Sequence, residues 1–294
     1  MGLFSRKKKK GFKTGLYGKH PDAADFLRLN ASGPDLRVLD EWLSAALVAA
    51  ERLVPDWQES YLSAPPVSLI FNPGGRSDLC IIATLAPSTD TSGRRFPLVL
   101  FAEAAFEVLT DSFPQVPLLS FFESASALHA RQKTLGRQQL LEQAERLAPP
   151  DPPAFEEAGR RLEDHLDRIT VGEAFPVPSG WVQRGLDELG NICRDVAPGR
   201  PLPRFGVRVP LNLRPAAQAA LWLRLVQGMC PVRLVPNALW TDQRLLLYLD
   251  RPSSKALVSL WRGDWEDDTV LDLDAVASEV GPDPARPLRA LLSS

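Results

Sequence analysis

Apolar residues recur at helical spacing along residues 34–54, which read "PDLRVLDEWLSAALVAAERLV". They fall three and four residues apart, which places them on one face of a helix. That face consists of Leu36, Leu39, Leu43, Ala46, Leu47, Ala50 and Val54. Pro34 suits the first turn of a helix, and Ser32 is placed to cap it. The pattern therefore predicts one long helix with its apolar face against a core.

The pattern changes after this helix to short apolar runs that are rich in β-branched and aromatic residues. They span residues 67–71, 79–85 and 96–102, and turn-forming segments separate them. Connections this short predict antiparallel pairing. Because both faces of the runs are apolar, both sides of the sheet should be covered. The expected fold class is α/β, a mixed and largely antiparallel sheet with helices on both faces, an α/β/α sandwich.

Helical patterns dominate the middle of the chain, and strands alternate with helices in the second half. Helices are expected over residues 116–132, 136–148, 154–170, 180–196, 215–229 and 252–261, and strands over 204–211, 232–240 and 243–250. The interpretation of the chain has four parts: a disordered basic tail (1–12), an N-terminal region (13–147), a proline-rich hinge (148–153) and a C-terminal α/β region (154–294). The two large regions are expected to pack into one globular unit around one mixed sheet.

Charge and composition exclude several classes of protein. The 294 residues carry a net charge of -2 and a pI of about 6.0, so nucleic acid is not an expected partner. The cations Arg6, Lys7, Lys8, Lys9 and Lys10 indicate a solvated tail or a weak peripheral contact with anionic lipid. Without a secretory signal or an apolar run of membrane-spanning length, the expected location is the cytoplasm, at most peripheral to the inner membrane.

Three cysteines, Cys80, Cys193 and Cys230, are widely spaced and odd in number. They indicate a reducing compartment rather than a disulfide framework or a metal cage. The acidic segment of residues 264–274 lacks the spacing of a calcium loop, and is interpreted as a solvated segment or an electrostatic contact surface. Neither a cofactor nor a metal ion is expected.

Gly15 and Gly18, followed by Lys19, resemble half of a phosphate-binding loop. The glycines are too close together for that loop, however. His20 replaces the hydroxyl residue that would hold magnesium, and Pro21 lacks an amide donor. The preferred interpretation is a short strand over residues 14–19 that ends in a proline turn, with Asp22 or Asp25 as a capping residue.

Histidine occurs only at His20, His129 and His165. The last two lie in charged helical segments, where a solvated position is expected. A hydrolase-like site of Ser88, Asp90 and His20 is the enzymatic alternative. It requires His20 within hydrogen-bond reach of the Ser88 hydroxyl, which sequence alone does not show.

Four ordered segments in the first hundred residues carry a family resemblance. The first contains Tyr17, Gly18, Lys19, Pro21, Asp25 and Phe26, and is followed by a helix with an early tryptophan, Trp42, and by "YLSAP" at residues 61–65. The fourth contains Pro87, Ser88, Asp90, Gly93, Arg94, Phe96, Pro97 and Leu98. Together they resemble the TagF (ImpM) family, which is associated with bacterial type VI secretion. Residues 238–261 also resemble the end of that family, while the match weakens after about residue 130.

The resemblance implies a compact α/β sandwich without enzymatic activity. It implies a post-translational repressor of type VI secretion assembly that opposes or bypasses a threonine-phosphorylation pathway. The partner that it implies is a forkhead-associated scaffold protein of the secretion system. Some family members are fused to a PP2C-type phosphatase, whose metal-binding motifs are not recognisable in this chain.

The motif residues also predict local structure. Gly18 is expected to allow a positive φ at the end of the strand. Asp25 is expected to pair with Arg94, so that Asp25, Ser88, Asp90 and Arg94 form a polar cluster where two loops meet. Two interpretations of this cluster remain open, because it could only hold the fold or could also shape a partner-binding face.

Overall fold

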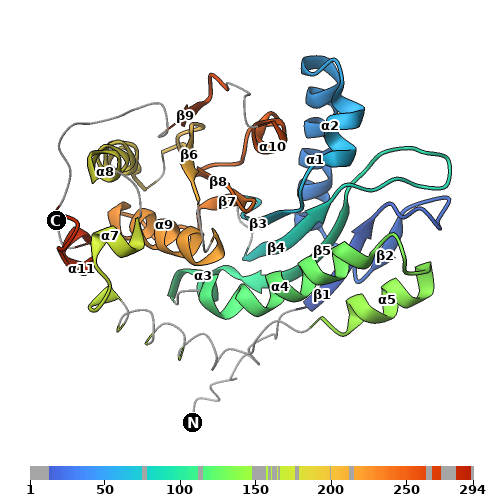
Figure 1. Cartoon of the computed structure of the whole chain (residues 1–294), viewed down its shortest axis with the longest axis horizontal. Helices are drawn as coiled ribbons and strands as arrows, with labels where there is room; N and C mark the ends of the chain where they lie inside the picture. Colours follow the sequence, from blue (N-terminus) through green and yellow to red (C-terminus); the bar gives the residue numbers. More distant parts are fainter. Residues whose placement is uncertain are drawn as a thin grey trace, which may run out of the picture.

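The computed structural model describes residues 13–74, 78–111, 115–147, 157, 160, 164, 166–175, 179–198, 200–211, 215–262, 267–272 and 283–292. Its described strands form one nine-stranded sheet in the order β2-β1-β5-β4-β3-β7-β8-β6-β9 (Figure 1). The strands are β1 (Lys13–Gly18), β2 (Leu27–Leu29), β3 (Val67–Phe71), β4 (Leu79–Ala86), β5 (Leu98–Ala105), β6 (Gly206–Pro210), β7 (Asn237–Trp240), β8 (Arg244–Tyr248) and β9 (Val270–Asp272). All neighbouring pairs are antiparallel except β6 and β9, which are parallel.

Helices cover both faces of this sheet, as the sequence predicts. The described helices are α1 (Pro34–Leu53), α2 (Trp57–Ser63), α3 (Phe106–Asp111), α4 (Gln115–Arg131), α5 (Arg137–Glu145), α7 (Val171–Ala174), α8 (Ser179–Arg194), α9 (Pro215–Met229), α10 (Ala256–Trp261) and α11 (Arg289–Leu292). One face packs against α1 and α10, and the other packs against α4, α5, α8 and α9 (Figure 1). The predicted α/β/α sandwich is therefore confirmed.

The molecule has two hydrophobic cores, one on each face of the sheet, and successive side chains of a strand point into them in turn. In β5, Leu98 and Leu100 point into the core under α4, whereas Val99 and Phe101 point into the core under α1. Successive side chains of a strand face opposite sides of a sheet, so a run that is apolar throughout fills both cores. This is why the strand sequences show no polar alternation.

The long helix α1 has the expected buried face, with one difference at its start. Its N-cap is Gly33, with φ 146° and no side-chain capping bond, rather than Ser32. Leu36, Leu39, Leu43, Ala46 and Ala50 are buried as predicted, and Trp42 is buried with them. Pro34 sets the first turn, so the helix begins where the sequence indicates without a side-chain cap.

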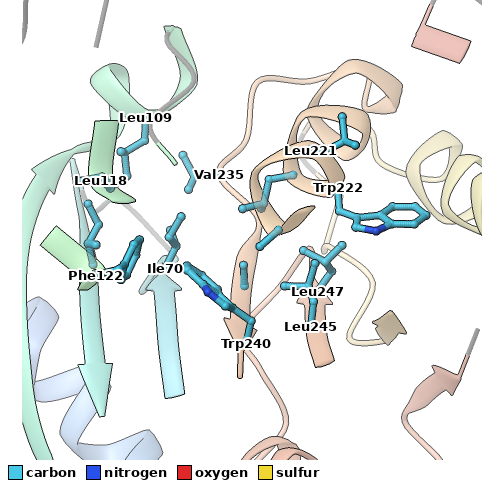
Figure 2. Close-up of a cluster of buried hydrophobic side chains, with 14 of the residues drawn as sticks. Ile70, Leu109, Leu118, Phe122, Leu221, Trp222, Val235, Trp240, Leu245 and Leu247 are labelled. Carbon is cyan, nitrogen blue, oxygen red and sulfur yellow. The ribbon is translucent and has the colours of Figure 1, made fainter. Parts of the chain in front are cut away.

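The two halves of the chain share the sheet at the junction of β3 and β7. Ser68 pairs with Trp240, and Ile70 pairs with Ala238. Trp240 also packs edge to face on Phe122 of α4, with 4.8 Å between ring centroids, and Figure 2 shows these side chains in one cluster. Strands from both the 13–147 and the 154–294 regions therefore belong to one hydrogen-bonded sheet.

Differences from the predicted elements have local causes. β7 begins at Asn237 rather than at residue 232, since Pro236 has no amide hydrogen to donate to a neighbouring strand. The short elements β2, β9, α2, α3, α7 and α11 were not predicted. The basic tail (1–12) and the proline-rich hinge (148–153) lie outside the described residues. Within the described ranges, no helix has the length and apolar content needed to cross a membrane.

Candidate functional site

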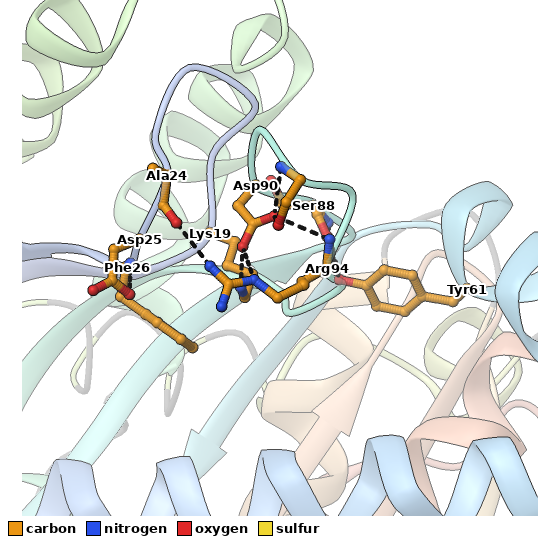
Figure 3. Close-up of polar contacts among 9 residues, drawn as sticks. Lys19, Ala24, Asp25, Phe26, Tyr61, Ser88, Asp90 and Arg94 are labelled. Carbon is orange, nitrogen blue, oxygen red and sulfur yellow. Dashed lines mark hydrogen bonds and ion pairs between the residues drawn. The ribbon is translucent and has the colours of Figure 1, made fainter.

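The carboxylate of Asp90 is the centre of the cluster formed by the two motif segments. Its Oδ2 accepts hydrogen bonds from Lys19 Nζ and, at 2.7 Å, from Arg94 Nε. Its Oδ1 accepts from Ser92 N at 3.0 Å, Ser92 Oγ at 2.7 Å and Arg94 N at 3.0 Å. Figure 3 shows how Lys19 and Arg94 converge on this carboxylate. Five donors therefore hold Asp90 in one orientation.

The three charged side chains of this cluster differ in exposure. The Asp90 side chain is fully buried, that of Lys19 is 6% exposed, and that of Arg94 is 62% exposed. Burial alone would raise the pKa of the Asp90 carboxyl, but hydrogen bonds from Lys19, Ser92 and Arg94 outweigh it and hold that pKa well below its usual range. Lys19 and Asp90 thus form an ion pair inside the protein, while Arg94 reaches the surface.

Three aromatic motif residues pack against one another on the side of the cluster where Phe26 meets Lys19. Tyr17 stacks on Phe26 at 5.2 Å, and Phe96 meets Phe26 edge to face at 4.9 Å between centroids. Lys19 Nζ lies 5.1 Å from the centroid of Phe26, a distance suited to a cation–π interaction. Tyr17 also donates a 2.7 Å hydrogen bond to Asp40 of α1. Aromatic residues of both motif segments therefore pack together, and Phe26 lies beside the lysine.

The glycine and proline of the first motif fix the chain path. Gly18 has φ 132°, and a Cβ there would lie 2.1 Å from the Pro97 carbonyl oxygen, so the predicted positive φ is confirmed. Pro21 follows in a turn that His20 O and Ala23 N close with a 2.9 Å hydrogen bond. Pro21 stands at the second position of this turn, where its fixed φ is favourable.

The predicted pairing of Asp25 with Arg94 is wrong. Asp25 is exposed, and its Oδ1 accepts a 2.7 Å hydrogen bond from the amide of Phe26. Arg94 instead pairs with Asp90 and donates from Nη2 to the carbonyl of Ala24 at 2.8 Å. Asp90, four residues before Arg94, lies within the same tight loop, whereas Asp25 satisfies its own local backbone. Gly93 supplies a φ of 79° within that loop.

Tyr61 of α2 holds the other side of this loop. Its hydroxyl accepts from Ser88 N at 2.9 Å and donates to Ser88 O at 3.1 Å, much as a backbone partner would. The Ser88 hydroxyl is buried, and no hydrogen-bond partner for it occurs in the described part of the chain. The role of Tyr61 was missed, although it opens the "YLSAP" segment that carries the resemblance.

His20 is buried with both ring nitrogens engaged. Its Nε2 donates to the Gln132 carbonyl at 2.9 Å, and its Nδ1 accepts from the amide of Asp22 at 3.2 Å. The lone pair that a general base would offer to Ser88 is therefore used by the backbone. The structure places Ser88 and Asp90 in one loop and gives His20 other partners.

His129 is buried, so the expectation of a solvated position is wrong. Its Nε2 donates to the carbonyl of Thr84 at 3.1 Å, and its Nδ1 faces Gln132 Oε1 at 3.3 Å. Burial lowers the pKa of His129 to about 4, although the hydrogen bonds oppose this shift. Gln132 in turn donates to the carbonyl of Pro87 at 3.0 Å, so the end of α4 is tied to the motif loop. His165 lies outside the described residues.

The acidic segment is only partly solvated. Of residues 264–274, the structure describes 267–272. Asp267 is 7% exposed, and its Oδ1 accepts from Thr269 N at 2.9 Å and from Thr269 Oγ1 at 2.7 Å. Asp268 is exposed and forms a 2.7 Å ion pair with Lys255. Asp267 therefore shapes the turn before β9, and of the two interpretations of this segment, that of a solvated segment does not hold for Asp267.

Comparison with known proteins places these motif segments in a family. Residues 15–147 match the model of the TagF N-terminal domain, which is described as type VI secretion system-associated. Residues 15–147 are therefore similar to a TagF N-terminal domain. This TagF domain contains all but the first residues of β1, together with β2 to β5 and α1 to α5, and so includes both motif segments. The resemblance noted from the sequence is confirmed.

Solved structures provide a further comparison with this TagF-containing chain. The crystal structure of PA0076 from Pseudomonas aeruginosa PAO1 at 2.05 Å resolution aligns with a TM-score of 0.47 and 18% sequence identity. The alignment covers 87% of this chain and 96% of that chain. A search among curated protein sequences gives no significant match.

Proposed function

We propose that this protein is a non-catalytic, post-translational repressor of type VI secretion assembly that acts by binding a component of the secretion system. The observation that carries the proposal is the TagF N-terminal domain of residues 15–147, because its family is type VI secretion-associated. A forkhead-associated scaffold protein is the proposed partner, as the family resemblance implies. The proposed location is the cytoplasm, where such a scaffold would be met.

The polar cluster supports binding rather than turnover. All five donors around Asp90 come from the protein itself, so this carboxylate has a structural task. His20 uses both ring nitrogens in contacts with the backbone. A serine nucleophile requires a base with an available lone pair. The hydrolase alternative of Ser88, Asp90 and His20 therefore has less support than the binding proposal.

The surface beside the cluster is the proposed partner-binding face. Arg95, which directly follows the exposed Arg94 in the sequence, lines an open depression together with Gln58, Glu59, Leu62 and Ser63. Leu62 is 44% exposed, and Arg95 lies over the ring of Trp57 at 5.5 Å. Because Tyr61 ties α2 to the loop that carries Arg94, the cluster holds this face in a fixed shape. In this proposal the cluster both stabilises the fold and shapes the partner-binding face.

Secretion of the tube protein of the system tests the proposed function. A repressor that acts by stoichiometric binding works in proportion to its amount. Deleting the gene should raise secretion, and overproducing the protein should block sheath assembly. Unchanged secretion in both strains would overturn the proposal, and the TagF domain would then mark a shared fold only.

Co-purification with the forkhead-associated scaffold tests the partner and the face. Leu62→Asp should weaken binding about tenfold or more, because a charge replaces an apolar contact at the centre of the proposed face. Arg137→Glu, on the exposed surface of α5, is the matched control and should bind normally. Binding by both variants at wild-type level would exclude this face, and no binding by the wild-type protein would exclude the scaffold.

A further inference from the structure

Two cysteines that are 37 positions apart in the sequence meet at the ends of two packed helices. Cys193 lies in the last turn of α8, and Cys230 directly follows α9. The carbonyl of Val226 contacts both residues. Cys193 Sγ approaches it at 3.9 Å, and the amide of Cys230 donates to it at 3.1 Å. One backbone atom of α9 therefore fixes both cysteines in the same small region.

The two thiols differ in environment. Cys193 is buried, whereas Cys230 is half-buried and reachable from solvent. The interaction with the Cys230 thiol, reinforced by burial, raises the pKa of Cys193. The interaction with the Cys193 thiol lowers the pKa of Cys230. A partly exposed thiol with a lowered pKa is the more reactive member of a pair. Cys230 thus has the properties of an attacking thiol, and Cys193 those of a resolving thiol.

The third cysteine lies in a contrasting position. Cys80 is fully buried within β4, at the centre of the sheet. Burial raises the pKa of Cys80 to about 12, so almost none of it is thiolate at neutral pH. The chain therefore contains an unreactive thiol that serves as an internal control.

We propose that Cys193 and Cys230 form a redox-sensitive dithiol that a hydroperoxide converts into a disulfide bond. The Cys230 thiolate attacks the outer oxygen of the hydroperoxide, and the O–O bond breaks. The products are the Cys230 sulfenic acid and, after proton uptake, an alcohol or water. The Cys193 thiol then attacks the sulfenic sulfur, its proton joins the departing hydroxide, and water leaves as the S–S bond forms. The hydroperoxide is reduced and the two thiols are oxidised.

The bond would join α8 to the end of α9, close to the TagF domain. Gln227, three residues before Cys230, donates to the carbonyl of Leu109 in α3 at 3.4 Å. Closing the chain between residues 193 and 230 would restrict the movement of this end of α9 relative to α8. The inference concerns a modification of the C-terminal region and does not depend on the repressor proposal.

Treatment of the purified full chain with hydrogen peroxide tests the dithiol. The intact mass should fall by about 2 Da, which is the loss of two thiol hydrogens. Peptide mapping should show Cys193 linked to Cys230 and Cys80 still free. In competition with a thiol-alkylating reagent, Cys230 should react at least about a hundredfold faster than Cys80, because far more of it is thiolate. A reducing agent should restore the original mass.

Two variants separate the roles of the thiols. Cys193→Ala should form no internal disulfide, and its Cys230 should be trapped as a sulfenic acid by dimedone. In Cys230→Ser, the remaining Cys193 thiol should be oxidised by peroxide no faster than the Cys80 thiol. The proposal is overturned if the wild-type protein gains oxygen without losing 2 mass units, or if Cys230 and Cys80 react at the same rate. Far-ultraviolet circular dichroism of each variant confirms that it is folded.

Discussion

Lys19 and Asp90 form a buried ion pair between residues that are 71 positions apart in the sequence. Lys19 directly follows β1, and Asp90 lies in the loop between β4 and β5. The contact therefore joins the two segments whose residues carry the TagF resemblance. Since the loop also holds the exposed Arg94 in place, the stability of this pair and the shape of the proposed binding face are coupled.

Replacing Lys19 should destabilise the protein strongly. Lys19→Met keeps an unbranched apolar side chain of similar length, but Asp90 loses its buried cationic partner. Removing one member of a buried ion pair leaves the other charge uncompensated, so we expect the free energy of unfolding to fall by about 3 kcal/mol. Urea denaturation of the full chain measures this change.

Arg94→Met is the matched comparison for Lys19→Met. Its side chain is 62% exposed, and Asp90 keeps Lys19 and both Ser92 donors without it. We expect a loss of about 1 kcal/mol or less, as for other solvent-exposed ion pairs. Equal losses for the two variants would show that Lys19 does not hold the cluster from within.

Gly18→Ala should be far more harmful than Gly93→Ala. Both glycines have positive φ, 132° and 79°. A Cβ at Gly18 would lie 2.1 Å from the Pro97 carbonyl oxygen, whereas a Cβ at Gly93 would meet nothing within 4 Å. We expect a loss of about 1 kcal/mol for Gly93→Ala from backbone strain alone, and more than about 3 kcal/mol for Gly18→Ala. Melting temperatures that fall by the same amount would contradict the close approach of β1 to Pro97.

His129 should make stability depend on pH between about 6.5 and 4. The unfolded histidine has a pKa of about 6.5, whereas burial lowers the pKa in the folded protein to about 4. As the pH falls through this window, His129 is protonated in the unfolded state but stays neutral in the folded state. The free energy of unfolding should therefore fall by about 3 kcal/mol, and His129 should cause no further loss below about pH 4.

His129→Gln isolates this contribution from that of the acidic residues. The variant is expected to be less stable at pH 7, because the hydrogen bond to Thr84 is altered. Its loss of stability between pH 6.5 and 4 should nevertheless be smaller than that of the wild-type protein by about 3 kcal/mol. Urea unfolding at five pH values would reveal the difference, and parallel curves would show that His129 titrates normally.

Periodicity was sufficient to predict the main elements. The apolar face of α1 and the runs of β3, β4 and β5 have patterns that depend only on neighbouring residues. Short connections also settled the antiparallel pairing of these three strands. The strands β2 and β9, with three residues each, and the helix α2, with only seven residues, are too short for a strand or helix period to be recognised.

The residues of the candidate site were predicted from the sequence, but the ion pairs between them were not. Lys19, Asp90 and Arg94 were identified from the motifs, yet Asp25 was assigned to Arg94 and Lys19 had no assigned partner. Which carboxylate meets which cation depends on how two distant loops fold together, and no local spacing records that. The same reason explains why Tyr61 was missed and why His129 was placed in solvent. A charged helical segment can still bury one polar residue where a backbone carbonyl accepts its hydrogen bond, as Thr84 does for His129.

The junction of β3 with β7 has a consequence for synthesis on the ribosome. Residues 67–71, "VSLIF", pair with β4 on one side. Their partner on the other side, residues 237–240, is synthesised much later. About 165 residues separate the two strands in the sequence, which corresponds to roughly 10 to 30 s of translation. During that interval the nascent TagF domain presents an apolar strand with an open edge, the feature on which chains aggregate. Premature termination or proteolysis in the second half would thus release a fragment that is prone to aggregate.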